Sequence, residues 1–163
     1  MGPAVTSRAD VVSAMAATDL DTVRAAAASV VDPEIPALTV EDMGILRDVT
    51  LENGAAVITI TPTYSGCSAM TAIRRDIESA VAEAGYPDVE VRTVLSPPWT
   101  TEWMSARGRR MLEESAIAPP GSATCPRCSS ASTTELSRFG TTACKALMVC
   151  DSCGEPFDLF KEL

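Results

Sequence analysis

The stretch Thr61-Pro62-Thr63-Tyr64-Ser65-Gly66-Cys67 joins two segments with different hydrophobic periodicity, and this junction decides the fold. Residues 55–61 are a short apolar run typical of a buried strand, whereas apolar residues in 69–84 recur at the spacing of an amphipathic helix. Pro62 ends the strand because it has no N–H to donate to a sheet, and Gly66 permits a sharp turn into the helix. The sequence therefore predicts a strand–loop–helix unit with a cysteine at the end of its loop.

Cys67 lies at or next to the N-terminus of this predicted helix, where unpaired N–H groups and the macrodipole favour a negative charge. We therefore expect its thiol to ionise more easily than that of a free cysteine, and a thiolate serves as a nucleophile or a metal ligand. The alternative is that Cys67 is a small, inert and partly buried side chain. The local pattern leaves both interpretations open.

The composition limits the class of protein. The 163 residues suffice for one ordinary domain and a small appendage, and 46% of them are hydrophobic, which allows a core to form. No apolar run approaches the ~20 residues that span a membrane, and the N-terminus lacks the basic and apolar regions of a secretory signal. We expect a cytoplasmic protein that does not associate with membranes.

The charge and the missing histidine narrow the chemistry. Residues 1–118 carry 9 basic and 17 acidic side chains, a net charge of −8, while the remainder contributes −1. An acidic surface disfavours nucleic-acid binding and suits docking to a basic patch on a protein. The chain has no histidine, which excludes Ser-His-Asp and Cys-His catalysis and histidine metal sites. Any chemistry must rest on thiols, carboxylates or a borrowed cofactor.

The N-terminal part of the sequence predicts a tail, a helix and a rigid loop. Residues 1–17 are small and weakly patterned, and we expect a flexible tail there. Helical spacing predicts a helix over 19–31, which ends before a loop with two prolines, Asp32-Pro33-Glu34-Ile35-Pro36. Asp32 and Glu34 are either solvated acids at a helix stop or a carboxylate pair that faces the loop cysteine.

The next segments predict a small sheet. Residues 45–52 alternate partly, Asn53-Gly54 is a strong hairpin signal, and 55–61 returns as the second strand. After the helix, alternation over 89–95 predicts a third strand. The fold class is therefore α+β, and its first unit is a small mixed domain of helices and three strands over 18–116.

Both tryptophans lie in Ser96-Pro97-Pro98-Trp99-Thr100-Thr101-Glu102-Trp103. A threonine just after Trp99 is suited to cap a helix that runs to about residue 115. Trp99 and Trp103 belong either to core or hinge packing, since tryptophan is usually mostly buried, or to a partner-docking patch, since tryptophan is favoured at interface hot spots.

A second unit, 125–163, follows a linker over 117–124 that is rich in Ala, Pro, Gly and Ser. It carries the pattern C-x₂-C…x₂₁…C-x₂-C, with the cysteines Cys125, Cys128, Cys150 and Cys153. Two such pairs close a tetrahedral S₄ site, and a unit this small needs a metal to fold well. We predict a C-terminal zinc-ribbon-like β domain with structural zinc. Mononuclear iron of the rubredoxin type is the main alternative, ahead of disulfides.

Within this unit we expect short strands over 133–137, 145–149 and 156–160. Phe157 and Phe160 are expected to cover the metal site. Cys144 stands outside the four-cysteine pattern, and it is either a small buried residue or a spare thiol near the metal.

Four stretches together resemble the PaaD (also called PaaJ) subunits of phenylacetyl-CoA ring-epoxidase systems, which are multicomponent oxygenases. They are the segments 32–36, 61–67 and 96–103 quoted above, and Ser137-Arg138-Phe139-Gly140-Thr141-Thr142-Ala143-Cys144-Lys145-Ala146-Leu147. The resemblance runs from about residue 20 to the end. Residues 20–116 also resemble the wider family of small iron–sulfur cluster assembly and carrier proteins, an α+β domain with its key cysteine in this loop.

The resemblance implies a non-catalytic subunit that assists assembly of an iron or iron–sulfur centre in the oxygenase or its reductase, which would be its partners. Carried over by position, Cys67 would be a transient ligand of iron or a cluster, with Asp32 and Glu34 as its neighbours and the four ribbon cysteines as metal ligands. A cluster shared by two protomers would require a homodimer. The sequence departs from the family pattern where Pro, Gly and Cys are expected, at Ser68, Ser129 and Glu162.

Two other functions remain open. The ribbon could hold redox iron and make the protein a rubredoxin-like electron-transfer module. The chain could also be a purely structural subunit of the oxygenase complex, in which Cys67 has no chemical role.

Overall fold

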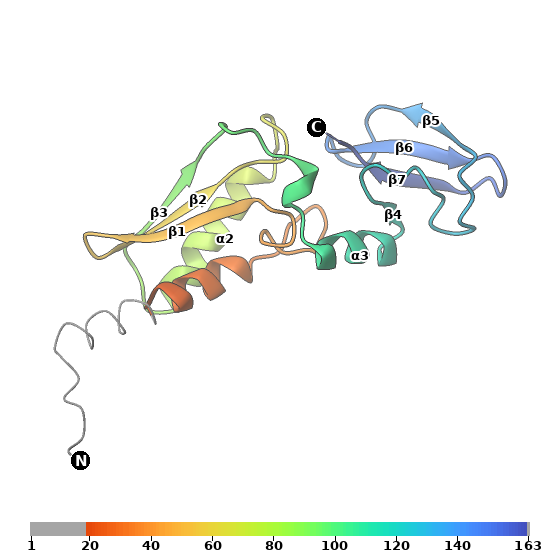
Figure 1. Ribbon diagram of the computed structural model, residues 1–163. Helices are drawn as coiled ribbons and strands as arrows, with labels where there is room; N and C mark the ends of the chain where they lie inside the picture. Colours follow the sequence, from red (N-terminus) through yellow and green to blue (C-terminus); the bar gives the residue numbers. More distant parts are fainter. Residues whose placement is uncertain (1–18, 163) are drawn as a thin grey trace, which may run out of the picture.

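The computed structural model describes residues 19–162, so the tail predicted over 1–17 lies outside the described residues. A three-stranded and a four-stranded sheet lie at opposite ends of an elongated molecule, with a helix between them along the chain (Figure 1). The α+β fold class predicted from the sequence is confirmed.

The first sheet begins with a tight hairpin. Strands β1 (Leu46–Glu52) and β2 (Ala55–Ile60) pair antiparallel. Asn53 and Gly54 between them have φ of 52° and 89°. A two-residue hairpin turn of this kind needs positive φ at both positions, which Asn-Gly adopts at low cost. The predicted hairpin is confirmed.

A helical crossover completes this sheet. Helix α2 (Met70–Glu83) follows β2 and leads to β3 (Val89–Thr93), which pairs parallel to β2. Parallel neighbours need such a crossover, and the loop that carries Cys67 leaves the carboxyl end of β2. The buried face of α2 consists of Ile73, Ile77 and Val81.

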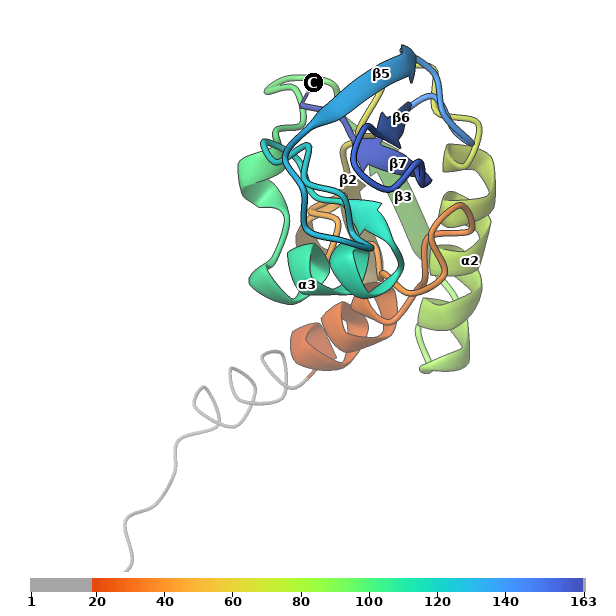
Figure 2. The same ribbon diagram turned by 90° about the vertical axis from the view of Figure 1, so that its right-hand side faces the viewer.

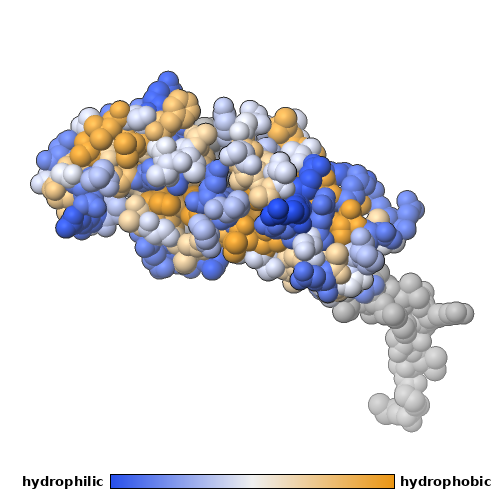
Figure 3. Space-filling view, turned by 180° about the vertical axis from the view of Figure 1, so that it is seen from behind, coloured by the Kyte–Doolittle hydropathy of each residue, from blue (hydrophilic) through white to orange (hydrophobic). Residues whose placement is uncertain are grey.

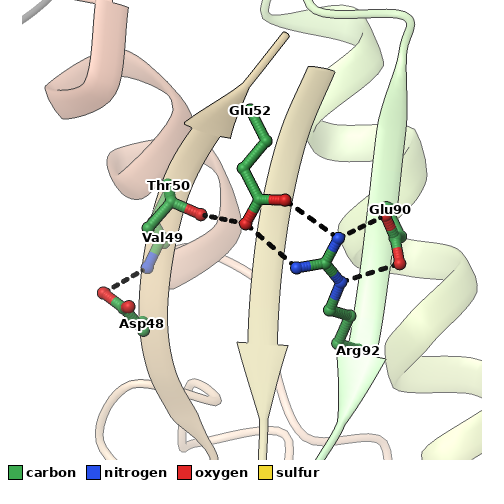
Figure 4. A network of polar contacts seen from close by, with 6 residues as sticks. All are labelled: Asp48, Val49, Thr50, Glu52, Glu90 and Arg92. Carbon is green, nitrogen blue, oxygen red and sulfur yellow. Dashed lines mark hydrogen bonds and ion pairs between the residues drawn. The ribbon is translucent and has the colours of Figure 1, made fainter. Parts of the chain in front are cut away.

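The outer face of the sheet is polar. Arg92 on β3 pairs with Glu90 at 2.7 Å on its own strand, and it reaches across β2 to Glu52 at 2.9 Å (Figure 4). Exposed ion pairs of this kind contribute about 1 kcal/mol or less. This network therefore marks a solvated face, and the core lies on the side of the sheet that α2 covers.

The first helix of the described chain is shorter than the sequence suggests. Residues 19–28 are helical, and Ser29 turns its hydroxyl back to the carbonyl of Ala26 at 2.8 Å. Val31 is extended, forms a β-bridge with Thr39 and is 48% exposed. The prediction of a helix over 19–31 was therefore wrong in its last turn, because an isolated bridge replaces it.

The helix predicted to follow Trp99 is also interrupted. A short 3₁₀ helix, η1 (Thr101–Trp103), precedes α3 (Ala106–Glu114). Ser105 separates them: its hydroxyl accepts from the N–H of Gly108 at 2.8 Å and donates to Asp42 at 2.8 Å. The new N-cap ends the prediction of one continuous helix.

Asp42 is a buried carboxylate that joins α3 to the first domain. It accepts from the hydroxyl of Thr39 at 3.0 Å and pairs with Arg107. A Cβ on Gly108 would lie 2.6 Å from the Asp42 carbonyl oxygen, so α3 packs directly on this backbone. These contacts position α3, and with it the first strand of the second sheet.

The second sheet contains the three strands expected there: β5 (Thr133–Ser137), β6 (Lys145–Cys150) and β7 (Pro156–Phe160). Its order is β4-β7-β6-β5, and the additional strand β4 (Ile117–Ala118) pairs parallel to β7. Strand β4 lies in the segment 117–124 that we expected to be a linker. The chain therefore joins the ribbon sheet before the four-cysteine motif begins.

The two sheets share one hydrophobic core. Phe160 from β7 is fully buried and meets the edge of Trp99, with ring centroids 5.9 Å apart. Phe160 does not cover the metal site as we expected, because it belongs to the first core, whereas Phe157 does pack with Cys125 and Cys150. The ribbon thus rests against the end of the first domain (Figure 2).

The surface of the protein is mixed in character. Small hydrophobic patches alternate with hydrophilic ones on the face seen in Figure 3. The large hydrophobic side chains that are most exposed in the described chain are Val31, Tyr64, Leu95, Leu136 and Phe139.

Candidate metal sites

The loop that carries Cys67 is tightly folded. Thr61 and Thr63 are buried at its start, and the N–H of Cys67 donates to the carbonyl of Tyr64 at 3.0 Å. The carbonyl of Cys67 accepts from the N–H of Met70, the first residue of α2. Cys67 therefore lies just before the helix, as predicted, and its side chain is half-buried.

The expected ease of ionisation of Cys67 is not observed. Burial raises its pKa, and the N–H of Ala69 at the start of the helix lowers it only in part. The nearby carboxylates of Glu34 and Asp32, together with Cys144, raise the pKa further. The helix terminus acts in the predicted direction, but desolvation and negative neighbours outweigh it.

Asp32 and Glu34 have different roles. Asp32 is 6% exposed and accepts from the N–H groups of Glu34 at 2.7 Å and Ile35 at 3.1 Å, so it holds the turn of its own loop. Burial raises its pKa against these two hydrogen bonds. Glu34 points towards the other loop and accepts from the hydroxyl of Ser68 at 3.1 Å. The structure therefore brings both acids near Cys67, and only Glu34 lines its cavity.

Cys144 reaches the same place from the second sheet. A cavity of about 40 Å³ is lined by Glu34, Cys67, Ser68, Cys144 and the backbone around them. Cys144 is 8% exposed and belongs to the first core, not to the cluster around the ribbon cysteines. The interpretation of Cys144 as a spare thiol near the ribbon metal was wrong, because its loop turns towards Cys67.

A network of polar contacts holds the Cys144 loop. The buried ammonium of Lys145 lies 3.4 Å from Asp158, which also accepts from the hydroxyl of Thr141 at 2.7 Å. A Cβ on Gly140 would lie 2.4 Å from the same carboxylate, and the N–H of Lys161 donates to the Cys144 carbonyl at 3.0 Å. The loop is thus fixed from both sides by residues of the ribbon.

The four ribbon cysteines form a second, separate cluster. Their Sγ atoms lie within 4.8 Å of one another, with Cys125 to Cys153 at 3.8 Å and Cys128 to Cys150 at 3.5 Å. Zinc bound by four thiolates at about 2.3 Å places the sulfurs about 3.8 Å apart in a tetrahedron. The geometry of the donors therefore fits a tetrahedral S₄ metal.

Each cysteine pair sits on the same kind of turn. The N–H of Ser129 donates to the carbonyl of Cys125 at 2.9 Å, and that of Gly154 donates to the carbonyl of Cys150 at 2.8 Å. Ser129 and Gly154 have φ of 61° and 74°. Burial opposes ionisation of Cys150, but N–H groups of Cys153 and Ser152 lower its pKa to about 6. A thiolate is the form that binds metal.

The two tryptophans differ in exposure. Trp99 is 3% exposed, and its indole N–H donates to the carbonyl of Met43 at 2.8 Å. This burial contradicts a docking role for Trp99, and core packing describes it. Trp103 is half-buried, with the guanidinium of Arg47 3.4 Å from its ring centroid. Partner docking therefore stays a prediction for Trp103 alone.

These features define a class of protein: a cluster-assembly-like domain joined to a four-cysteine ribbon. Residues 20–95 match the family described as iron–sulfur cluster assembly protein, and residues 113–161 match the PaaD zinc beta ribbon domain. In the part of the chain that the structure describes, no helix is long and apolar enough to cross a membrane.

The relatives identify the family. The chain is 47% identical over 140 residues to an Escherichia coli protein named as the fourth-lettered (D) component of 1,2-phenylacetyl-CoA epoxidase, and the match covers 80% of this chain and 85% of that protein. The chain therefore belongs to the PaaD family of phenylacetyl-CoA epoxidase subunits.

Its first half has other relatives. It is 37% identical over 78 residues to the Fe–S protein maturation auxiliary factor YitW of Bacillus subtilis, covering 47% of this chain and 76% of that one. A solved structure from Bacillus anthracis, a domain of unknown function named DUF59, is 29% identical with a TM-score of 0.57 and covers 61% of this chain and 96% of that one. The similarity to these proteins includes the loop of Cys67.

Proposed function

We propose that the protein is a non-catalytic maturation subunit of a phenylacetyl-CoA epoxidase in phenylacetate degradation. It delivers iron or an iron–sulfur cluster to the oxygenase or to its reductase, with Cys67 as the transient ligand. The relationship to PaaD-type epoxidase subunits and to Fe–S maturation factors supports this role. The half-buried thiol of Cys67 beside Glu34 is the observation that carries it, because a site that releases its cargo has to stay reachable from solvent.

The ribbon has a supporting role in this proposal. Its four thiols surround a structural zinc ion, which would be bound by Cys125, Cys128, Cys150 and Cys153 and would supply folding energy and no chemistry. The six cysteines are all free in the structure, which fits the reducing cytoplasm. The partners would be the oxygenase and reductase subunits, docked in part through Trp103.

The test is reconstitution of the epoxidase with variants of this protein. Cys67→Ser should abolish the gain in oxygenase activity that the wild-type protein gives, while circular dichroism and zinc content stay unchanged. Cys67→Ala is the matched variant without a ligand atom and should behave identically. Full activity with either variant would contradict a carrier role and leave a purely structural subunit as the explanation.

The geometry of the ribbon favours one alternative strongly enough to test. An S₄ tetrahedron with these spacings accommodates iron as well as zinc, and iron there would make the protein a rubredoxin-like electron carrier. Elemental analysis and a visible spectrum of protein purified without oxygen decide between them. A colourless protein with one zinc per chain excludes electron transfer through the ribbon.

A further inference from the structure

We propose that Cys67, Cys144 and Glu34 together bind a single ferrous ion, in a site that the two domains of one chain build jointly. This inference deepens the proposed function, on which it rests, by naming the cargo and its ligands. It also replaces the expectation that a second protomer must supply the missing ligands.

The first argument is the convergence of three distant segments. Glu34, Cys67 and Cys144 come from the loop after the first helix, the loop after β2 and the loop before β6, and all three line the same cavity. Thiolate sulfur with carboxylate oxygen is a mixed donor set suited to a borderline divalent transition metal. A single solvent-facing cysteine offers one ligand, whereas this cavity offers three.

The second argument is that the Cys144 loop is built to point inward. Lys145, Asp158 and Lys161 fix the backbone on both sides of Cys144, and the hydroxyl of Thr142 lies 3.1 Å from its sulfur. On the other wall, Ser68 donates to Glu34 and orients that carboxylate. Both walls of the cavity therefore present their donors in defined positions.

The third argument is the charge around the cavity. Besides burial, which is the main cause, the carboxylates of Glu34 and Asp32 raise the pKa of both thiols. Lys145 opposes this effect at Cys144, but its ammonium is paired with Asp158. The groups that face the two thiols are thus mainly anionic, and a divalent cation between them would be stabilised.

The fourth argument is size. A water-sized sphere needs about 10–15 Å³ of such volume, so the cavity of about 40 Å³ holds an ion and a water or two. In the described chain only the ribbon thiols already lie within 4.8 Å of one another, so Cys67, Cys144 and Glu34 must rotate inward to bind. Binding releases the two thiol protons to solvent, and no electron is transferred.

The experiment is an anaerobic titration of the full-length, zinc-loaded protein with ferrous iron alone, followed by equilibrium dialysis. We expect one iron per chain in addition to the ribbon metal. Cys144→Ser and Cys67→Ser should each weaken iron binding at least tenfold, and Glu34→Gln should weaken it by a smaller factor. Glu41→Gln removes an exposed carboxylate outside the cavity and should leave the affinity unchanged.

Folding is controlled separately. Serine nearly matches cysteine in size, and an unchanged zinc content and melting temperature show that the ribbon is intact in Cys144→Ser. Glu34→Gln changes a side chain that packs in neither core, so it tests the site even if the cysteine variant folds poorly.

The outcomes separate this inference from the proposed function. Iron binding and epoxidase maturation that depend on Cys67 but not on Cys144 would overturn the shared site and leave the carrier role standing. One iron per two chains, unaffected by Cys144→Ser, would overturn it in favour of a bridged homodimer. Maturation that depends on neither cysteine would overturn the carrier role itself.

Discussion

The two cysteine clusters of this protein are organised in opposite ways. The ribbon thiols come from two short turns of the same kind and already lie at the distances of a bound tetrahedral metal. Cys67 and Cys144 come from different domains, line one cavity and are not drawn together. A closed set of donors suits a metal that stays, and an open set suits a metal that leaves.

The comparison is tested most severely by removing one ligand from each cluster. Cys150→Ser should cost more than about 4 kcal/mol and unfold the ribbon, since structural zinc sites contribute on the order of 10 kcal/mol of folding free energy. Cys67→Ser should change the free energy of unfolding by less than about 1 kcal/mol, because the thiol is half-buried. Urea denaturation followed by tryptophan fluorescence measures both, and equal losses would contradict the distinction.

A smaller effect is expected where the two regions meet. Phe160→Ala removes a fully buried ring that contacts Trp99 and should cost about 3–5 kcal/mol. Because Phe160 belongs to the first core and to a ribbon strand, the two domains should still unfold in one transition. Thermal unfolding followed by calorimetry tests this, and two separated transitions in the wild-type protein would argue against a shared core.

The Cys144 loop can be disturbed without touching a thiol. Gly140→Ala would place a Cβ 2.4 Å from the Asp158 carboxylate and should cost about 1–3 kcal/mol through overpacking. Iron binding should weaken with it, whereas zinc content should not change. Gly85→Ala is no equivalent control because of its φ of 103°; Ser79→Ala on the exposed face of α2 should be neutral in both assays.

The smallest effect concerns the two ribbon turns. Ser129 has φ of 61°, the conformation that glycine adopts at the equivalent Gly154. Ser129→Gly should therefore stabilise the protein by about 0.5 kcal/mol, since relief of left-handed strain exceeds the added entropy of the unfolded chain only slightly. A shift of the denaturation midpoint measures it, and clear destabilisation would mean that the Ser129 side chain has a role of its own.

Local patterns predicted much of this fold because the responsible forces act over few residues. The Asn53-Gly54 hairpin, the buried face of α2 and the spacing of the ribbon cysteines depend on neighbours along the chain. The helix ends were predicted less well, because distant residues decide them. Val31 leaves its helix to pair with Thr39, and Ser105 caps α3 while it bonds to Asp42.

The candidate site divides in the same way. Cys67 could be predicted from the strand–loop–helix unit, and Glu34 from its place in a rigid loop. The contribution of Cys144 could not, since it lies 77 positions further along and reaches the cavity only because the ribbon packs on the first domain. The isolated cysteine between two threonines and a lysine was the one local signal, and nothing near it in the chain indicated its target.

The end of strand β7 has a consequence for dissecting the protein. Its last residue, Phe160, fills the first core, and the next N–H, from Lys161, anchors the Cys144 loop. A truncation that begins at residue 157 would remove a ribbon strand, uncover the neighbouring domain and release Cys144 in one cut. The C-terminus is thus the latch of the whole molecule, and neither half is a faithful sample of the intact chain.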